Sequence, residues 1–227
     1  MNWEYITQAL EPKTLSDIVF ADDKHQQTIH RIVSGVKPFP SSGKNGILLY
    51  GVPGTGKSAL AMLLPQAMEA SRGGADAYER VFRIVSGQNG ADMIKKIDAQ
   101  AQLVSDASHQ YFVLDEVDNL TAVAMTSLKS AMNNSNAIFI LTTNNLSAIE
   151  VGIKDRCILV PFNAAPAERW LPRANKLLQL GGVTGVQEDD LLNVINTCQG
   201  SARKIIDALS DVVIDCRAQQ GLPAIPR

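Results

Sequence analysis

The sequence contains one stretch whose residue types and spacing suit the binding of a nucleoside triphosphate. Residues 51–58 read Gly-Val-Pro-Gly-Thr-Gly-Lys-Ser, which fits the pattern G-x-x-x-x-G-K-[ST]. The glycines allow a tight turn that brings backbone N–H groups close to phosphate oxygens. Lys57 can reach the β- and γ-phosphates, and the Ser58 hydroxyl can ligate Mg²⁺. We therefore expect ATP and Mg²⁺ as cofactors, bound through Gly51, Val52, Pro53, Gly54, Thr55, Gly56, Lys57, Ser58 and Ala59.

The alternative for this stretch is a glycine-rich turn with an exposed lysine. The flanking residues favour the phosphate loop. An apolar run at 47–50 precedes it and is typical of a buried strand, and a helical pattern of apolar residues begins at Ala59. A helix N-terminus at this point adds partial positive charge where phosphates would sit.

Two adjacent carboxylates, Asp115 and Glu116, end the apolar run at 112–116. Acidic residues are unfavourable within a sheet, so their place at a strand end suggests a function. Asp115 would hold the water shell of Mg²⁺, and Glu116 would act as the general base that polarises the attacking water. An ordinary turn is the alternative, because Asp is common there, and Asp118 is open to that explanation too.

Polar side chains also follow the apolar run at 137–143. Ligands bind at the carboxyl ends of parallel strands, so Asn144 is placed to orient the lytic water or to contact the γ-phosphate. Asn145 could take this part instead, or could be a turn residue. Arg203 lies in the first turn of a predicted helix, where a cation opposes the helix dipole. A nearby phosphate would compensate, although an exposed arginine on a solvated face is the alternative.

Alternating strands and helices must position these residues. Apolar runs predict strands at 47–50, 81–85, 112–116, 137–143 and 158–160, and helical spacing is found between them, as over 91–104. Near-continuous apolar strands indicate a parallel sheet covered on both faces. After 161–166 only helical patterns remain, and Ser201 is placed to cap a long helix. We predict an α/β P-loop ATPase core over 1–162 and a small all-helical domain over 163–227.

Composition limits the other functions that are open to the chain. The 227 residues are 45% hydrophobic and 19% charged, which is typical of a globular protein. The net charge of −2 excludes a wholesale basic surface, so contact with DNA would need a local patch. Lys95 and Lys96 are candidates for that patch, although a solvated helix face explains them equally well.

The cellular setting is predicted from cysteines and from the absence of targeting signals. The three cysteines lack C-x-x-C spacing, which argues against a disulfide framework or a zinc site and fits a reducing compartment. The chain does not start like a signal peptide, and no apolar run approaches the roughly 20 residues of a membrane span. We expect a cytoplasmic protein without a membrane partner.

Five motifs, in their order and spacing, resemble those of the AAA+ ATPases, and among these the clamp-loader subunits of the replication factor C and phage type. The resemblance covers about residues 10–215. Besides the phosphate loop, residues 115–118 are similar to the D-E-x-D acidic motif, and Thr143-Asn144 to sensor 1. Asp155-Arg156-Cys157 resembles the Ser-Arg-Cys motif, and residues 200–204, with Arg203, resemble sensor 2.

The resemblance implies a five-stranded parallel sheet in the order 5-1-4-3-2 with a helical lid. It implies that Arg156 is a finger that reaches the ATP of a neighbouring subunit, and that Arg203 senses the γ-phosphate. Segment 12–19 is similar to the family's N-terminal box, which places Val19 against the adenine. Lys129 stands where the family has a basic residue after a leucine. In contrast to the family, Pro172 would interrupt the first lid helix.

The function implied is ATP hydrolysis by a homo- or hetero-oligomer of AAA+ subunits in DNA replication or a related DNA transaction. A clamp-loader ATPase, with a sliding clamp as partner, is the first candidate. The sequence lacks the helical collar domain of clamp loaders, which favours the second candidate, a helicase-loader or transposition-regulator ATPase with a helicase or transposase as partner. The third is a nucleotide-gated scaffold that barely hydrolyses ATP, against which Glu116 argues.

Overall fold

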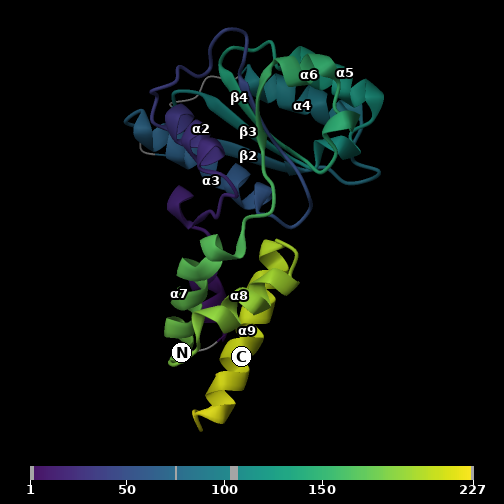
Figure 1. The fold of residues 1–227 in the computed structure, drawn as a ribbon. Helices are drawn as coiled ribbons and strands as arrows, with labels where there is room; N and C mark the ends of the chain where they lie inside the picture. The colour runs from purple at the N-terminus through teal and green to yellow at the C-terminus, as the bar shows by residue number, and fades with distance from the viewer. Residues whose placement is uncertain (1–2, 75, 103–106, 226–227) are drawn as a thin grey trace. The chain divides into compact units, whose positions relative to one another are not determined.

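The computed structural model describes residues 3–74, 76–102 and 107–225. Contacts divide the chain into two compact units, both drawn in Figure 1. The sheet unit comprises Asp23–Val52 and Lys57–Phe162. The helical unit comprises Met1–Asp22, Pro53–Gly56 and Asn163–Arg227. Among the described residues, no helix is long and apolar enough to cross a membrane.

A five-stranded parallel sheet forms the centre of the sheet unit. Its strands are β1 (Gly46–Tyr50), β2 (Tyr78–Arg83), β3 (Gln110–Asp115), β4 (Ala137–Thr143) and β5 (Cys157–Pro161). They lie in the order β2-β3-β4-β1-β5, which confirms the predicted order 5-1-4-3-2. The strands β3 and β4 are buried along their whole length, as their continuous apolar sequences predict. The register places the carboxyl ends of β1, β3 and β4 at one edge of the sheet.

Helices cover both faces of this sheet (Figure 1). One face carries α2 (Asp23–Val33) and α3 (Lys57–Ser71), and the other carries α4 (Ala91–Ala101), α5 (Ala122–Ala131) and α6 (Val151–Asp155). Thr121 caps α5 by accepting a hydrogen bond from the amide of Ala124. Short 3-10 turns, η2 (Val117–Asn119) and η3 (Leu146–Ala148), follow β3 and β4. The phenyl rings of Phe112 and Phe139 stack at 5.5 Å in the core.

A buried polar network joins the end of α3 to the start of β3. The carboxylate of Glu69, which is 2% exposed, accepts hydrogen bonds from Ser108 N and Oγ at 2.8 and 2.6 Å and from Tyr111 OH at 2.8 Å. Burial raises the pKa of Glu69, but the bonds from Ser108 and Tyr111, with Arg72 nearby, outweigh burial and hold it below its ordinary value. The network ties together two elements whose opposite ends lie at the candidate site.

The helical unit contains α1 (Trp3–Leu10), α7 (Leu171–Gly181), α8 (Glu188–Thr197) and α9 (Ala202–Gln219), with the 3-10 turns η1 (Leu15–Asp17) and η4 (Ala167–Trp170). Its core gathers buried side chains of α7, α8 and α9, including Leu177, Leu191 and Ile205. The prediction that Pro172 interrupts the first lid helix is wrong. Pro172 lies in the first turn of α7, where a backbone N–H has no helical partner to lose.

The N-terminal segment differs from its predicted place. The sequence assigned residues 1–22 to the ATPase core, but Ile6 and Leu10 are buried in the core of the helical unit. Arg173 of α7 donates hydrogen bonds to the backbone oxygens of Leu10 and Asp17. A short amphipathic helix has an apolar face but carries no sequence signal for the core against which it packs, which explains the difference.

Element bounds differ where burial is incomplete. The second strand runs over Tyr78–Arg83 rather than 81–85, because this edge strand pairs on one side alone and four of its six residues are exposed. The third strand ends at Asp115, since Glu116 turns into the left-handed region with φ 63°. The helix predicted over 91–104 is described over Ala91–Ala101, and residues 103–106 lie outside the described part of the chain.

Candidate functional site

The predicted phosphate loop lies between the end of β1 and the start of α3. Gly51, Gly54 and Gly56 have φ values of 148°, 81° and 104°, which side chains with a Cβ rarely adopt. A Cβ at Gly51 would also approach the backbone oxygen of Phe162 to 2.5 Å. The glycines that the pattern required are therefore the residues that this backbone path requires.

Lys57 is the first residue of α3 and is almost fully buried, with 6% exposure. Its Nζ donates hydrogen bonds to the backbone oxygens of Gly51 at 2.9 Å and Val52 at 2.7 Å. Burial lowers the pKa of Lys57 below its ordinary value, while Asp115 and the neighbouring acids oppose that shift. The ammonium group therefore lies against its own loop, where its positive charge would attract an anion.

The two residues predicted to hold the metal are brought together. Ser58 Oγ donates a hydrogen bond of 2.6 Å to Asp115 Oδ1, and Thr142 Oγ1 donates one of 2.6 Å to the same atom. Hydroxyl and carboxylate oxygens are ligands that suit Mg²⁺, which needs few protein ligands beside water and phosphates. In the described ranges, no group of three or more His, Cys, Asp or Glu could hold another metal ion. Ser58 and Asp115 therefore fit Mg²⁺.

Glu116 has an uncommon backbone conformation, with φ 63° and ψ 51° in the left-handed region. Such a conformation costs a non-glycine residue about 1–3 kcal/mol and is often found at functional sites. The amide of Glu116 donates to Thr142 Oγ1 at 3.0 Å. Its carboxylate accepts from Asn119 Nδ2 at 3.3 Å and lies 3.8 Å from a guanidinium nitrogen of Arg83.

Glu116 also lines a cavity of about 430 Å³, together with Ile84, Val85, Ser86, Asn89 and Asn119. The left-handed turn thus places Glu116 at the lining of this cavity, with its carboxylate beside Asn119 and Arg83. Sequence reasoning missed three partners of the acids, namely Thr142, Arg83 and Asn119. In the strand register Arg83 pairs with Asp115 and Thr142 pairs with Leu49, whereas Asn119 lies in the 3-10 turn after β3.

The two candidate asparagines at the end of β4 have different surroundings. Asn145 Oδ1 accepts hydrogen bonds from Ser147 N at 3.2 Å and Ser147 Oγ at 2.6 Å, so its side chain caps η3. Asn144 is exposed. Its side chain has no recorded hydrogen bond in the described part of the chain. The geometry therefore favours Asn144 over Asn145 as a residue that faces a ligand.

Arg156 lies at the opposite edge of the sheet from the phosphate loop. Its backbone oxygen accepts hydrogen bonds from the amides of Asn45 and Gly46, where β1 begins. The five residues of β1 therefore separate Arg156 from the loop, a length of roughly 16 Å. Its guanidinium donates to Asn133 Oδ1 at 3.1 and 2.9 Å and to the backbone oxygen of Gly152 at 2.9 Å. No recorded ion pair of the described residues joins it to Asp155.

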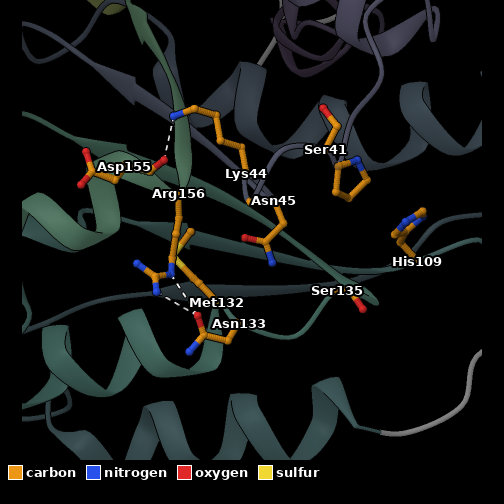
Figure 2. A pocket seen from close by; sticks show the side chains of 11 residues that line it. Ser41, Lys44, Asn45, His109, Met132, Asn133, Ser135, Asp155 and Arg156 are labelled. Carbon is orange, nitrogen blue, oxygen red and sulfur yellow. Dashed lines mark hydrogen bonds between the residues drawn. The ribbon is translucent and has the colours of Figure 1, made fainter.

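Arg156 lines a cavity of about 510 Å³ at this edge (Figure 2). Figure 2 shows its guanidinium directed at Asn133 and the amine of Lys44 directed at the backbone oxygen of Asp155. The other lining residues are Pro40, Ser41, Gly43, Asn45, His109, Met132 and Ser135. Within its own sheet unit, Arg156 is thus far from Ser58 and Asp115.

The remaining predicted residues have other surroundings. Val19 packs against the core of the helical unit, and Arg203 is exposed in the first turn of α9, which Ser201 caps. Lys95 and Lys96 are exposed on α4, where Lys95 forms a 3.0 Å ion pair with Asp92. Lys129 of α5 is paired with Glu150 at the start of α6.

Comparison with known proteins supports the geometry. The sequence profile of the family described as "ATPase family associated with various cellular activities (AAA)" matches residues 47–161, about half of the chain. The fold is similar to the RuvB Holliday junction branch migration motor of Thermotoga maritima, with a TM-score of 0.70, 17% identity, and 95% of this chain and 69% of that chain covered. No curated protein sequence matches the chain.

Two further solved structures have the same fold. A mutant form of Thermotoga maritima RuvB aligns with a TM-score of 0.72 and 16% identity, over 96% of this chain and 70% of that chain. PCH-2 of C. elegans aligns with a TM-score of 0.63 and 18% identity, over 94% of this chain and 66% of that chain. At such identities these likenesses are evidence of fold alone.

Proposed function

The chain belongs to the AAA family of ATPases, and from this premise we propose that it hydrolyses ATP within an oligomer that acts on DNA, most like a clamp-loader subunit. One observation carries the proposal for the chemistry. A single set of hydrogen bonds joins the residue after the phosphate lysine, Ser58, to Asp115 and, through Thr142, to the amide of Glu116. Phosphate, metal and water would thus be handled by groups that are already in contact.

Each group has a distinct part in this proposal. Amides of loop 51–58 and the loop's lysine would bind the phosphates, and Ser58 and Asp115 would hold Mg²⁺. Bound Mg²⁺ neutralises the charge that develops on the transferred phosphoryl group. Glu116 accepts the proton of the attacking water, and Asn144 orients that water or contacts the γ-phosphate.

Arg156 supports the oligomeric part of the proposal. A strand length of roughly 16 Å lies between Arg156 and its own phosphate loop, and its guanidinium donates to Asn133 and Gly152 at the far end, which supports a role outside its own subunit's site. An arginine supplied by a neighbouring subunit stabilises the charge of the transition state. From the family resemblance we also propose that Val19 contacts the adenine and that Arg203 senses the γ-phosphate.

The test of the chemistry is the substitution Glu116→Gln. We expect ATP affinity to stay near that of the wild type while steady-state turnover falls by about a hundredfold or more, because a general base contributes 10²–10⁴ in rate. Retained turnover would refute the assigned role of Glu116. It would leave nucleotide binding, measured by titration of a fluorescent ATP analogue, as a separate question.

The likeness to RuvB, whose description names Holliday junction branch migration, supports a second candidate among the DNA-linked AAA+ ATPases. It is a helicase-loader or transposition-regulator ATPase. The two candidates are separated by co-purification from the native host, scored for a sliding clamp against a helicase or transposase. ATPase stimulation by primer–template DNA plus that clamp would favour the clamp loader, and stimulation that needs a helicase or transposase would favour the alternative.

A nucleotide-gated scaffold remains the third candidate. Its supporting observation is that Asn119 and Arg83 contact the Glu116 carboxylate in this structure. Multiple turnovers of ATP by the assembled wild-type protein would exclude it, whereas a single turnover followed by stable assembly would support it.

A further inference from the structure

One hydroxyl group connects both acids of the candidate site. Thr142 Oγ1 accepts the hydrogen bond from the Glu116 amide at 3.0 Å and donates its own proton to Asp115 Oδ1 at 2.6 Å. A hydroxyl carries one proton and two lone pairs, so it can serve both partners at once. Thr142 is 1% exposed, which means that water does not replace these bonds easily.

The position of Thr142 follows from the sheet. It is the second-last residue of β4, which lies between β3 and β1, and in register it pairs with Leu49 just before the phosphate loop. Because β3 ends at Asp115 and turns at Glu116, a side chain from β4 at this level meets both residues. The rigid centre of the sheet thus holds the hydroxyl.

Each bond has a separate geometric consequence. The bond to the Glu116 amide satisfies a donor at a left-handed residue and so favours the turn that directs this side chain toward its cavity. The bonds from Thr142 and Ser58 both fall on Asp115 Oδ1. Together the two bonds restrain the rotamer of the Asp115 carboxylate.

We propose that Thr142 is a positioning residue for ATP hydrolysis, whose hydroxyl sets the Glu116 turn and the Asp115 carboxylate together. The proposal rests on the roles proposed above for Glu116 and Asp115. It distinguishes the hydroxyl of Thr142 from its methyl group, because only the hydroxyl makes these bonds. A merely structural threonine would depend on volume instead.

The test compares Thr142→Val, which keeps the shape and removes the hydroxyl, with Thr142→Ser, which keeps the hydroxyl and removes the methyl. We expect Thr142→Val to lower kcat by about tenfold to a hundredfold, the range for groups that orient a metal or catalytic ligand, with the KM for ATP little changed. It should also raise the Mg²⁺ concentration needed for half-maximal rate. Thr142→Ser should stay within about threefold of the wild type.

A second measurement needs neither ATP nor Mg²⁺. Amide hydrogen exchange at Glu116 in the nucleotide-free protein should be faster in Thr142→Val and unchanged in Thr142→Ser. Thr126→Val is the control, because Thr126 is an exposed α5 residue whose hydroxyl bonds to Ala122 O. It should match the wild type in both measurements.

Three results would overturn the inference. These are wild-type kcat in Thr142→Val, equal loss in the Val and Ser variants, and unchanged exchange of the Glu116 amide in Thr142→Val. Failure of the proposed function has a different signature, because Glu116→Gln would then hydrolyse ATP as fast as the wild type. If Glu116→Gln is inactive while Thr142→Val is fully active, only the role of Thr142 is wrong.

Discussion

Arg156 offers the sharpest test of whether the ATPase works as an assembly. Arg156→Ala removes the proposed finger, and Lys57→Ala removes the phosphate-binding lysine, so we expect each protein alone to be inactive. In the wild type, a trans arginine contributes about 10³–10⁵ in rate in well-studied phosphoryl-transfer enzymes. Within one chain, roughly 16 Å of strand separates Arg156 from the start of the loop that carries Lys57.

Mixing the two variants should restore activity by a predictable amount. In a head-to-tail ring every interface pairs one subunit's loop with its neighbour's finger face. An interface is productive when the loop comes from Arg156→Ala and the finger from Lys57→Ala. For random equimolar mixing this holds at about one quarter of all interfaces, whatever the subunit number. The rate should therefore reach about a quarter of the wild-type rate at equal proportions and fall on either side.

The assay is steady-state ATP hydrolysis against the mixing ratio, with co-assembly followed by light scattering. Lys154→Ala is the matched control, since Lys154 is a cation of the short helix α6, which ends just before Arg156, and is not among the described residues that line the Arg156 cavity. It should be active without a partner. A mixture that co-assembles but stays inactive would refute the trans arginine, as would wild-type specific activity that is independent of concentration down to the monomer.

Four further outcomes are expected. Lys57→Ala should abolish binding of a fluorescent ATP analogue, because no other residue of the loop supplies a cation to the β- and γ-phosphates; affinity equal to wild type would contradict the phosphate loop. Arg203→Ala should weaken the binding of ATP more than the binding of ADP in the same titration, whereas substitution of an ordinary surface arginine would show no such difference. Glu69→Gln should lower the free energy of unfolding by about 1–3 kcal/mol near pH 7, because a buried network loses its charged acceptor. The pKa of Glu69 is held below its ordinary value of 4.5, so the difference in the free energy of unfolding between wild type and variant should persist above pH 4.5 and become smaller as the pH falls below it. Denaturation curves followed by circular dichroism measure this difference. A difference that does not change with pH would show that the charge of Glu69 is not the source of the stabilisation. Charge reversal at Lys95 and Lys96 together should weaken DNA binding. It should also lower the slope of log affinity against log salt concentration by about one unit per lost phosphate contact. An unchanged salt dependence would show that these two lysines do not contact DNA.

The fold was predictable where the sequence is locally unambiguous. The strands β3 and β4 are buried throughout, so their sequences are continuous apolar runs, and the loop at 51–58 is constrained residue by residue. The edge strand β2 pairs with β3 alone and is mostly exposed, including its first two residues, which left its start at Tyr78 without a signal.

The site was predictable in its residue types but not in its geometry. The sequence placed Ser58 after the strand at 47–50 and placed Asp115 and Glu116 at the end of the strand at 112–116, and Ser58 and Asp115 do meet. The left-handed turn at Glu116 and its bond to Thr142 depend on the register between β3 and β4 along the strand axis. An apolar strand with a threonine near its end gives no indication of that register, because threonine is common in strands for its branched shape.

The length of β1 limits the insertions and deletions that this segment can accept. It is five residues long, is paired on both sides with β4 and β5, and has the phosphate loop at one end and the backbone that holds Arg156 at the other. Substitution by another apolar residue keeps this span. An in-frame insertion or deletion of one codon would exchange the two faces of the strand and move one end by about 3.3 Å relative to the other. If Arg156 acts in trans as proposed, such a change would disturb a subunit's own phosphate loop and the finger it offers to its neighbour together, so the length of β1 should tolerate less change than its side chains.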